Sequence, residues 1–102
     1  MVEEQTQEQS FERRVVIRNP HGLHMRPAMD FVDRASRFLC AVSLQKGGER
    51  VDGKSIMQLA LLRATQGTEL RLTTSGQDAG EAVEVLAAIL EKESYDSPAE
   101  GR

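Results

Sequence analysis

Apolar residues follow two different spacings along this sequence. In some short runs every second residue is apolar, which is typical of strands with one buried face. In longer runs apolar residues recur every three or four positions, which is typical of amphipathic helices. The first spacing predicts strands at Arg13–Arg18, Cys40–Gln45 and Thr68–Ser75. The turn residues 46–48, Lys-Gly-Gly, then predict a hairpin whose returning strand is Glu49–Asp52.

The second spacing predicts three helices. The first runs from Met25 to about Arg37, the second opens at Ser55, and the third carries the longest apolar stripe, from Ala79 to Leu90. Pro27 falls in the first turn of the first helix, where the N–H that proline lacks would have no partner in any case.

Polar residues mark the starts of the second and third helices. Ser55 with Gln58, and Asp78 with Glu81, have the spacing of a capping box, in which two side chains satisfy N–H groups at a helix start. In the second helix the positions expected to face the core are Ile56, Leu59, Ala60 and Leu62, which leaves Met57 and Leu61 outside.

The order strand, helix, strand, strand, helix, strand, helix predicts an α+β fold. The economical packing is an open-faced two-layer sandwich, in which a four-stranded antiparallel sheet carries all three helices on one face. We expect one domain over residues 13–93, because 102 residues suit a single domain. The acidic segment 1–12, rich in Glu and Gln, and the polar segment 94–102 are expected to be disordered tails.

The net charge of −3 is concentrated at the two ends of the chain. Residues 13–90 carry 11 basic and 8 acidic side chains, and a mildly basic domain favours an acidic protein partner. Basic residues are too dispersed, and aromatic residues too few, for a nucleic-acid surface. Cys40 is the only cysteine, so no internal disulfide can form, and its apolar surroundings predict a core residue. We expect a cytoplasmic monomer without cofactor, signal peptide or membrane insertion.

Two histidines and an arginine lie where the first strand gives way to the first helix. N–H groups at a helix start lack partners and attract anions such as phosphate. His24 could accept a phosphoryl group on a ring nitrogen, Arg26 could bind the phosphoryl oxygens, and Gly22 would permit a tight turn before them. On residue types alone a second interpretation stays open, in which His24 only caps the helix and Arg26 is a solvated surface residue.

Three further features have more than one interpretation. His21 and His24 are three residues apart, but no thiolate pair or carboxylate cluster completes a metal-ligand set, so a metal site is disfavoured. Ser55 is a good N-cap and also a candidate for phosphorylation, which a helix N-terminus favours. Core filling and an exposed docking patch are both open for the apolar residues Met25, Met29, Ile56 and Met57.

Residues 22–28, Gly-Leu-His-Met-Arg-Pro-Ala, resemble the phosphorylation-site motif G-[LI]-H-x-R-P-A of HPr. HPr is the histidine-containing phosphocarrier of the bacterial phosphoenolpyruvate-dependent sugar phosphotransferase system. Residues 53–57, Gly-Lys-Ser-Ile-Met, resemble the regulatory serine motif of the same family. The similarity runs from about Arg13 to Glu93, and two motifs at a consistent distance make it specific. The chain departs from the family at Met25, usually a small residue or threonine, and at Arg63, often glycine.

The resemblance implies an HPr-type sandwich that carries a phosphoryl group and is not an enzyme. His24 would be phosphorylated on Nδ1 by Enzyme I and would pass the group to the IIA domain of a sugar permease, with Arg26 stabilising it. Ser55 would be the target of the ATP-dependent HPr kinase/phosphorylase. Its phosphorylation would slow the uptake of the phosphoryl group from Enzyme I. The surface that partners use would include Met25, Met29, Ile56, Met57 and Ala60.

A rival function is a regulatory HPr-like binding module that acts through phosphorylation of Ser55 without sugar transport. The presence of both His24 and Arg26 favours the carrier, because a pure regulator would need only Ser55. A metal-binding protein is the third and least favoured interpretation, and it predicts stability that depends on zinc.

Overall fold

The structure is a computed structural model that describes residues 9–93, so residues 1–8 of the first expected tail and the whole second tail, 94–102, lie outside the described residues. The elements are β1 (Ser10–Val16), α1 (Met25–Ala35), β2 (Ala41–Lys46), β3 (Glu49–Asp52), α2 (Ile56–Leu62), β4 (Glu69–Ser75) and α3 (Ala79–Leu90). Their order confirms the predicted sequence of strands and helices.

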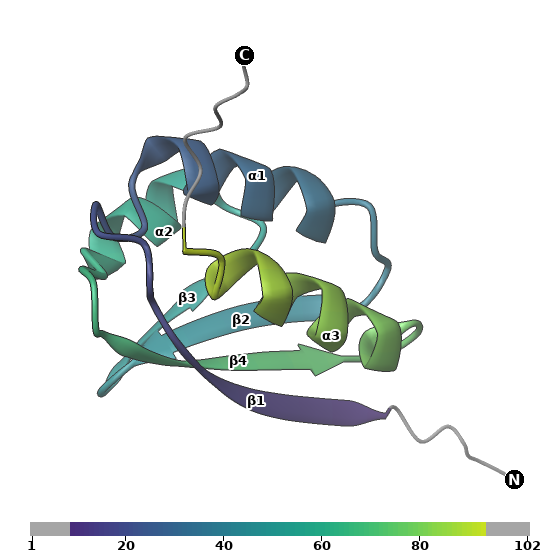
Figure 1. Ribbon diagram of the computed structural model, residues 1–102. Coiled ribbons are helices and arrows are strands. Elements are labelled where there is room, and N and C mark those ends of the chain that lie inside the picture. The colour runs from purple at the N-terminus through teal and green to yellow at the C-terminus, as the bar shows by residue number, and fades with distance from the viewer. Residues whose placement is uncertain (1–8, 94–102) are drawn as a thin grey trace, which may run out of the picture.

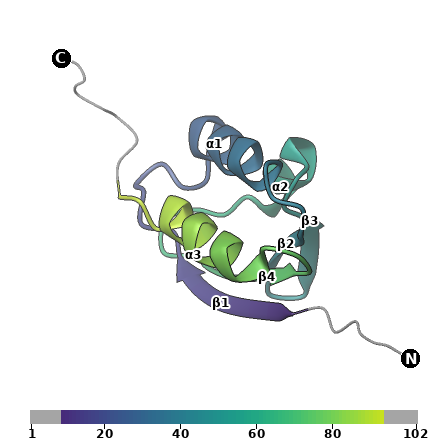
Figure 2. The same cartoon turned by 90° about the vertical axis from the view of Figure 1, so that its right-hand side faces the viewer.

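The four strands form one antiparallel sheet in the order β1-β4-β2-β3. All three helices lie on the same face of this sheet, and the other face is left open, as Figure 1 and the turned view in Figure 2 show. The predicted open-faced α+β sandwich is therefore confirmed.

The core lies between the sheet and the helices. On the sheet side it is filled by every second residue of the strands. Leu70, Leu72 and Thr74 of β4 are all buried, as their spacing predicted. The hydroxyl of Thr74 donates a hydrogen bond to the carbonyl oxygen of Ala79 (2.8 Å), so this buried polar group is satisfied. The predicted stripe of α3 is buried at every position, namely Ala79, Ala82, Val83, Leu86, Ala87 and Leu90.

The first strand begins earlier than predicted. Ser10 pairs with Ser75 and Phe11 with Thr74, so residues 10–12 belong to β1 rather than to a tail. The Phe11 ring packs against Gly80 of α3, where an added Cβ would lie 3.3 Å from the ring. The polar composition of residues 1–12 concealed this, because the partners of Ser10 and Phe11 come from the far end of the chain.

The two predicted capping boxes are only partly formed. The hydroxyl of Ser55 accepts from the Gln58 N–H (3.2 Å), but the Gln58 side chain accepts from the Asp52 N–H instead of returning to Ser55. Asp78 precedes α3 with a left-handed backbone (φ 59°) and makes no capping bond, so this box was wrong.

The carboxylate of Asp78 acts across the fold instead. It accepts hydrogen bonds from the N–H groups of Leu39 and Cys40, at 3.2 and 3.3 Å, and so ties the segment before β2 to the start of α3. Burial raises the pKa of the Cys40 thiol, and the neighbouring Asp78 carboxylate raises it further. Cys40 is 1% exposed, which confirms it as a core residue.

The second helix has a narrower buried face than expected. Leu59 and Leu62 are buried and Ile56 is half-buried, but Ala60 is exposed, so placing Ala60 in the core was wrong. The helix has only seven residues, about two turns, and it contacts the core through Leu59, Leu62 and the half-buried Ile56.

The end of α2 is closed by an unusual combination of residues. Arg63 adopts a left-handed conformation (φ 50°, ψ 48°), in which a side chain with a Cβ is strained and glycine is preferred. The Lys46 ammonium group donates hydrogen bonds to the carbonyl oxygens of Leu62 (2.8 Å) and Arg63 (3.3 Å). The lysine therefore satisfies two carbonyl groups at the helix C-terminus.

Arg63→Gly should raise the free energy of unfolding by about 0.5–1 kcal/mol, because it removes the strain of a left-handed non-glycine residue. Urea unfolding followed by circular dichroism measures the change. Arg63→Ala is the matched control, since it deletes the same charge and keeps the Cβ. Equal stability of the two variants would show that the backbone conformation of Arg63 costs nothing.

Candidate functional site

The segment that joins β1 to α1 is an anchored turn. The Gly22 N–H donates to the Asn19 carbonyl oxygen and the His21 N–H donates to the Asn19 side-chain oxygen, both at 2.9 Å. Asn19 is 4% exposed, so the turn is organised around a buried polar side chain. These bonds hold the backbone of His21 and Gly22 in one arrangement.

The same turn rests on the residues that follow α2. The Leu23 N–H donates to the Ala64 carbonyl oxygen (2.8 Å). Gly22 has φ +72°, and an added Cβ would lie 2.6 Å from that oxygen and 2.9 Å from the Thr65 Cα. Only glycine fits this position, because both the conformation and the space exclude a side chain.

His24 is the N-cap residue of α1, with an extended backbone (φ −85°, ψ −171°) and an exposed ring. The ring makes no capping hydrogen bond, so the interpretation of His24 as a simple cap is wrong. Ala28 is the first residue of the helix whose N–H reaches a carbonyl, that of His24 (3.0 Å). Pro27 has no N–H, and within residues 9–93 nothing accepts from the N–H groups of Met25 and Arg26.

The start of α1 thus presents unpaired N–H donors next to an exposed imidazole. A helix N-terminus of this kind attracts anions through these donors and through the helix dipole. Arg26 is exposed, and none of the ion pairs among the described residues involves it. The His21 ring lies edge-on to the His24 ring, with 5.7 Å between the ring centroids.

The described part of the chain offers no third metal ligand beside these rings. Residues 9–93 contain no group of three or more His, Cys, Asp or Glu side chains that could hold a metal ion. Two imidazoles alone do not make a typical protein metal site, which takes four ligands for zinc.

An apolar hollow lies beside this histidine, between α1 and α2. It is lined by Met25, Met29, Val32, Asp33 and Ile56. The side chains of Met25 and Met29 are 61% and 56% exposed, and Met57 is 77% exposed. The open choice between core filling and a surface patch is settled for these methionines, which form a surface patch.

Helices α1 and α2 run in opposite directions. Ala64, after the end of α2, contacts the turn before α1, whereas Ile56, at the start of α2, shares the hollow with Val32 in the middle of α1. Ser55 therefore lies at the other end of α2 from the His24 turn, about 10 Å of helix away. Of the residues of α2, it is Ile56, which follows Ser55 in the chain, that lines the apolar hollow.

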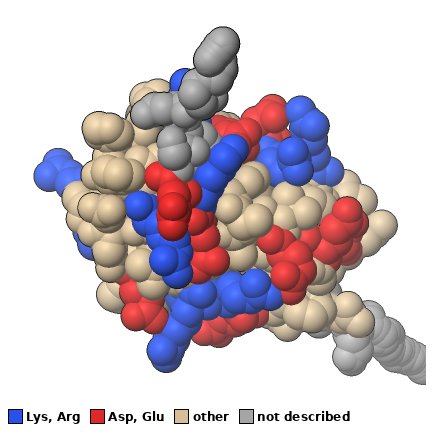
Figure 3. Space-filling view, viewed as in Figure 1, with Lys and Arg blue, Asp and Glu red and all other residues tan. Residues whose placement is uncertain are grey.

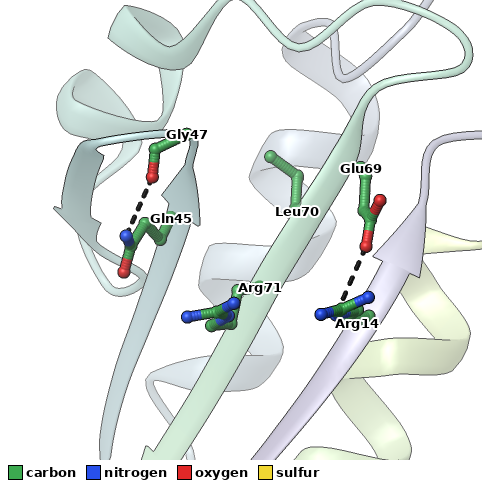
Figure 4. Close-up of a pocket in the computed structure, with 6 residues that line it drawn as sticks. All are labelled: Arg14, Gln45, Gly47, Glu69, Leu70 and Arg71. Atoms are coloured by element: carbon green, nitrogen blue, oxygen red, sulfur yellow. Dashed lines mark hydrogen bonds and ion pairs between the residues drawn. The ribbon is translucent and has the colours of Figure 1, made fainter.

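A second hollow, on the open face of the sheet, has a different character. Figure 4 shows Arg14 paired with Glu69 (3.5 Å) and the Gln45 side chain bonded to the Gly47 carbonyl oxygen (2.8 Å). Arg71 is paired with Glu12 (2.7 Å). Charges of both signs also alternate over the side formed by β1 and α3 (Figure 3), so this side carries no continuous basic surface.

The fold is a small open-faced α+β sandwich whose first helix starts at an exposed histidine. A family model described as "PTS HPr component phosphorylation site" matches residues 11–92. The HPr-like protein Crh of Bacillus subtilis is 44% identical over 82 residues, 80% of this chain and 96% of that protein. The phosphocarrier protein HPr of Buchnera aphidicola is 38% identical over 80 residues, 78% and 94% of the two chains.

Solved structures agree with these relatives. The crystal structure of the phosphocarrier protein HPr from Bacillus anthracis has a TM-score of 0.77 and 39% identity, over 80% of this chain and 98% of that one. The chain belongs to the HPr family of the phosphotransferase system, and the HPr phosphocarriers of this family are not enzymes. Among the described residues, no helix combines the length and the apolar character needed to cross a bilayer.

Two features of this site could not be predicted from the sequence. Nothing in the sequence connects Ala64 with Gly22 and Leu23, because the contact joins residues about forty positions apart and uses a backbone carbonyl. The edge-on contact of the His21 and His24 rings is likewise not predicted by the sequence, since a spacing of three residues across a turn does not determine how two rings face each other. The glycine at position 22 was the one available signal of a close backbone approach.

Gly22→Ala should lower the free energy of unfolding by about 1–3 kcal/mol, because the new Cβ is both in a left-handed conformation and against the Ala64 backbone. The variant's urea midpoint measures this. Gly47→Ala is the matched control, with φ +58° and no atom within 4 Å of the added Cβ. The contact with Ala64 matters only if Gly22→Ala costs clearly more than Gly47→Ala.

Proposed function

We propose that this protein is a phosphoryl carrier of a sugar phosphotransferase system, with His24 as the acceptor. The observation that carries the proposal is the exposed, uncapped ring of His24 beside the unpaired N–H groups of Met25 and Arg26. A ring nitrogen with a free lone pair, Nδ1 in this proposal, forms a bond to phosphorus while the bond between phosphorus and the donor breaks. The donor is Enzyme I, and the next acceptor is a IIA domain of a sugar permease.

The surroundings of His24 suit the phosphorylated state. The phosphoryl group arrives with negative charge, which the N–H groups and the dipole at the start of α1 stabilise. The Arg26 guanidinium can bind two phosphoryl oxygens at once and has no competing ion pair among the described residues. The group is held but remains exposed, as a carrier requires.

The partners would dock on the apolar surface next to His24. Exposed Met25, Met29, Met57 and Ala60, with half-buried Ile56, belong to α1 and α2 on either side of the hollow. An exposed apolar patch beside the reacting group is typical of a docking surface. A partner that covers it would bring its own reacting group to His24. That the protein acts as a monomer stays a prediction.

Ser55 is proposed as the regulatory site, phosphorylated by an HPr kinase/phosphorylase. Its hydroxyl already lies at the start of α2 and accepts from the Gln58 N–H, so a phosphate there would keep an N–H partner. The phosphate would add up to two negative charges beside Ile56 and Met57. Ser55 lies at the start of α2, whereas the turn before His24 contacts the residues after its end. The effect would therefore fall on partner docking and not on the imidazole.

A regulatory module without sugar transport is the second candidate. The similarity to Crh, described in its solution structure as the catabolite repression HPr of Bacillus subtilis, supports it. Incubation with phosphoenolpyruvate and Enzyme I, followed by intact mass measurement at neutral and acid pH, separates the two. A phosphate that acid removes identifies a carrier. No addition, together with an acid-stable phosphate from ATP and the kinase, would identify a regulator.

His24→Ala should abolish phosphoryl acceptance from Enzyme I and leave the fold intact, because the exposed ring makes no hydrogen bond that the fold needs. Its free energy of unfolding, measured by urea denaturation, should stay within about 0.5 kcal/mol of the wild-type value, as is usual for surface positions. Transfer of label to the variant at the normal rate would assign the acceptor to another residue.

Ser55→Asp should slow phosphoryl uptake from Enzyme I by at least about tenfold, because a like charge placed against an acidic partner costs on the order of a few kcal/mol. Initial rates of labelling at low Enzyme I concentration measure the effect. Ser55→Asn is the control, since asparagine caps a helix equally well without charge. Uptake by Ser55→Asp at the rate of Ser55→Asn would leave Ser55 with a capping role alone.

A further inference from the structure

The proposed mechanism leaves one exposed imidazole next to the acceptor without a role. The His21 ring stands nearly perpendicular to the His24 ring, at an interplanar angle of 87° and a centroid distance of 5.7 Å. His21 is exposed, and the part of the chain that the structure describes contains no ion pair or side-chain hydrogen bond of its ring. The donors of this ring are therefore available to a group bound at His24.

The position of His21 is set by the buried base of the turn. Its N–H is bonded to the Asn19 side chain, which is almost completely buried, and the next residue, Gly22, is packed against the Ala64 carbonyl. A shift of His21 away from His24 would break these contacts. The ring is thus presented to His24 by a rigid backbone, which is what a group that orients a reactant requires.

We propose that His21 is a positioning residue for the phosphoryl group on His24, to which its ring donates a hydrogen bond. The inference rests on the proposed function of His24. It adds a third donor to those already described, the N–H groups at the start of α1 and the Arg26 guanidinium. Together the three donors would orient the phosphoryl group for transfer.

The distance between the rings suits this role. A phosphoryl oxygen stands two bonds beyond the His24 ring nitrogen, and a hydrogen bond to it adds about 2.9 Å. At 5.7 Å between centroids, the edge of the His21 ring is within that reach. An imidazole always carries at least one N–H, so the ring can donate whether neutral or charged. This hydrogen bond exists only when the phosphoryl group is present, so it stabilises the phosphorylated state.

A purely structural role for His21 makes the opposite prediction for suitable variants. If the ring only supports the His24 ring by contact, an aromatic replacement should preserve it. His21→Phe keeps a flat ring and removes the donors, whereas His21→Asn removes the ring and keeps an N–H donor. Because His21 is exposed, neither replacement disturbs the core, and amide NMR spectra of both variants would verify the fold.

The experiment equilibrates the full chain with Enzyme I at a fixed ratio of phosphoenolpyruvate to pyruvate. It measures the ratio of phosphorylated to free protein by intact mass and the phosphohistidine signal by phosphorus NMR. We expect His21→Phe to lower that ratio about tenfold, the effect of losing one hydrogen bond to a charged group, and to shift the phosphorus signal. His21→Asn should remain within about threefold of the wild type.

The outcomes separate this inference from the proposed function. A wild-type ratio and an unshifted phosphorus signal in His21→Phe overturn the positioning role and leave His24 as the acceptor. A loss in His21→Asn as large as in His21→Phe also overturns it, because the ring and not the donor would then matter. Absence of phosphate on the wild-type protein removes the proposed function itself. Acid-labile phosphate on His21 of the His24→Ala protein would make His21 an acceptor and overturn both.

Discussion

The hydrogen bond from the Leu23 N–H to the Ala64 carbonyl oxygen determines where the first helix begins. This bond holds the turn of residues 19–24 against the end of α2, and so does the close packing of Gly22 on the same carbonyl group. Arg63 turns the chain through a left-handed conformation just before Ala64, and Lys46 holds the carbonyls beside it. This contact between the turn and the end of α2 leaves His24 and the unpaired N–H groups after it exposed.

Helix α2 connects the two chemical features of the molecule. Its C-terminal end supports the turn of His24, and its N-terminal end carries Ser55. Its antiparallel packing against α1 leaves the hollow between Met25, Met29 and Ile56 open to solvent. A partner that covers this hollow would contact Met25, next to His24, and Ile56, next to Ser55. Under the proposed function, a charge at Ser55 would act on partner docking and would leave the imidazole of His24 unchanged.

Local patterns predicted well wherever one face of an element meets the core. The alternation of Leu70, Leu72 and Thr74 and the stripe of α3 were correct at every position, because burial is periodic in both kinds of element. Predictions failed where the burial or bonding of a side chain depends on distant segments. Asp78 has the sequence spacing of a cap, yet its carboxylate accepts from the N–H groups of Leu39 and Cys40, and Ala60 is apolar but lies outside the narrow buried face of α2.

The sequence by itself determined the order of the elements, the faces they bury and the chemical groups at the start of α1, because these depend on neighbouring residues. Only the tertiary structure decided that β1 begins at Ser10, that Ala64 supports the His24 turn, and that the His21 ring stands against the His24 ring. The first two depend on contacts between distant segments, and the third depends on the turn that those contacts hold. A backbone carbonyl such as that of Ala64 is present in every residue, so no sequence pattern can reveal which one a distant N–H will use.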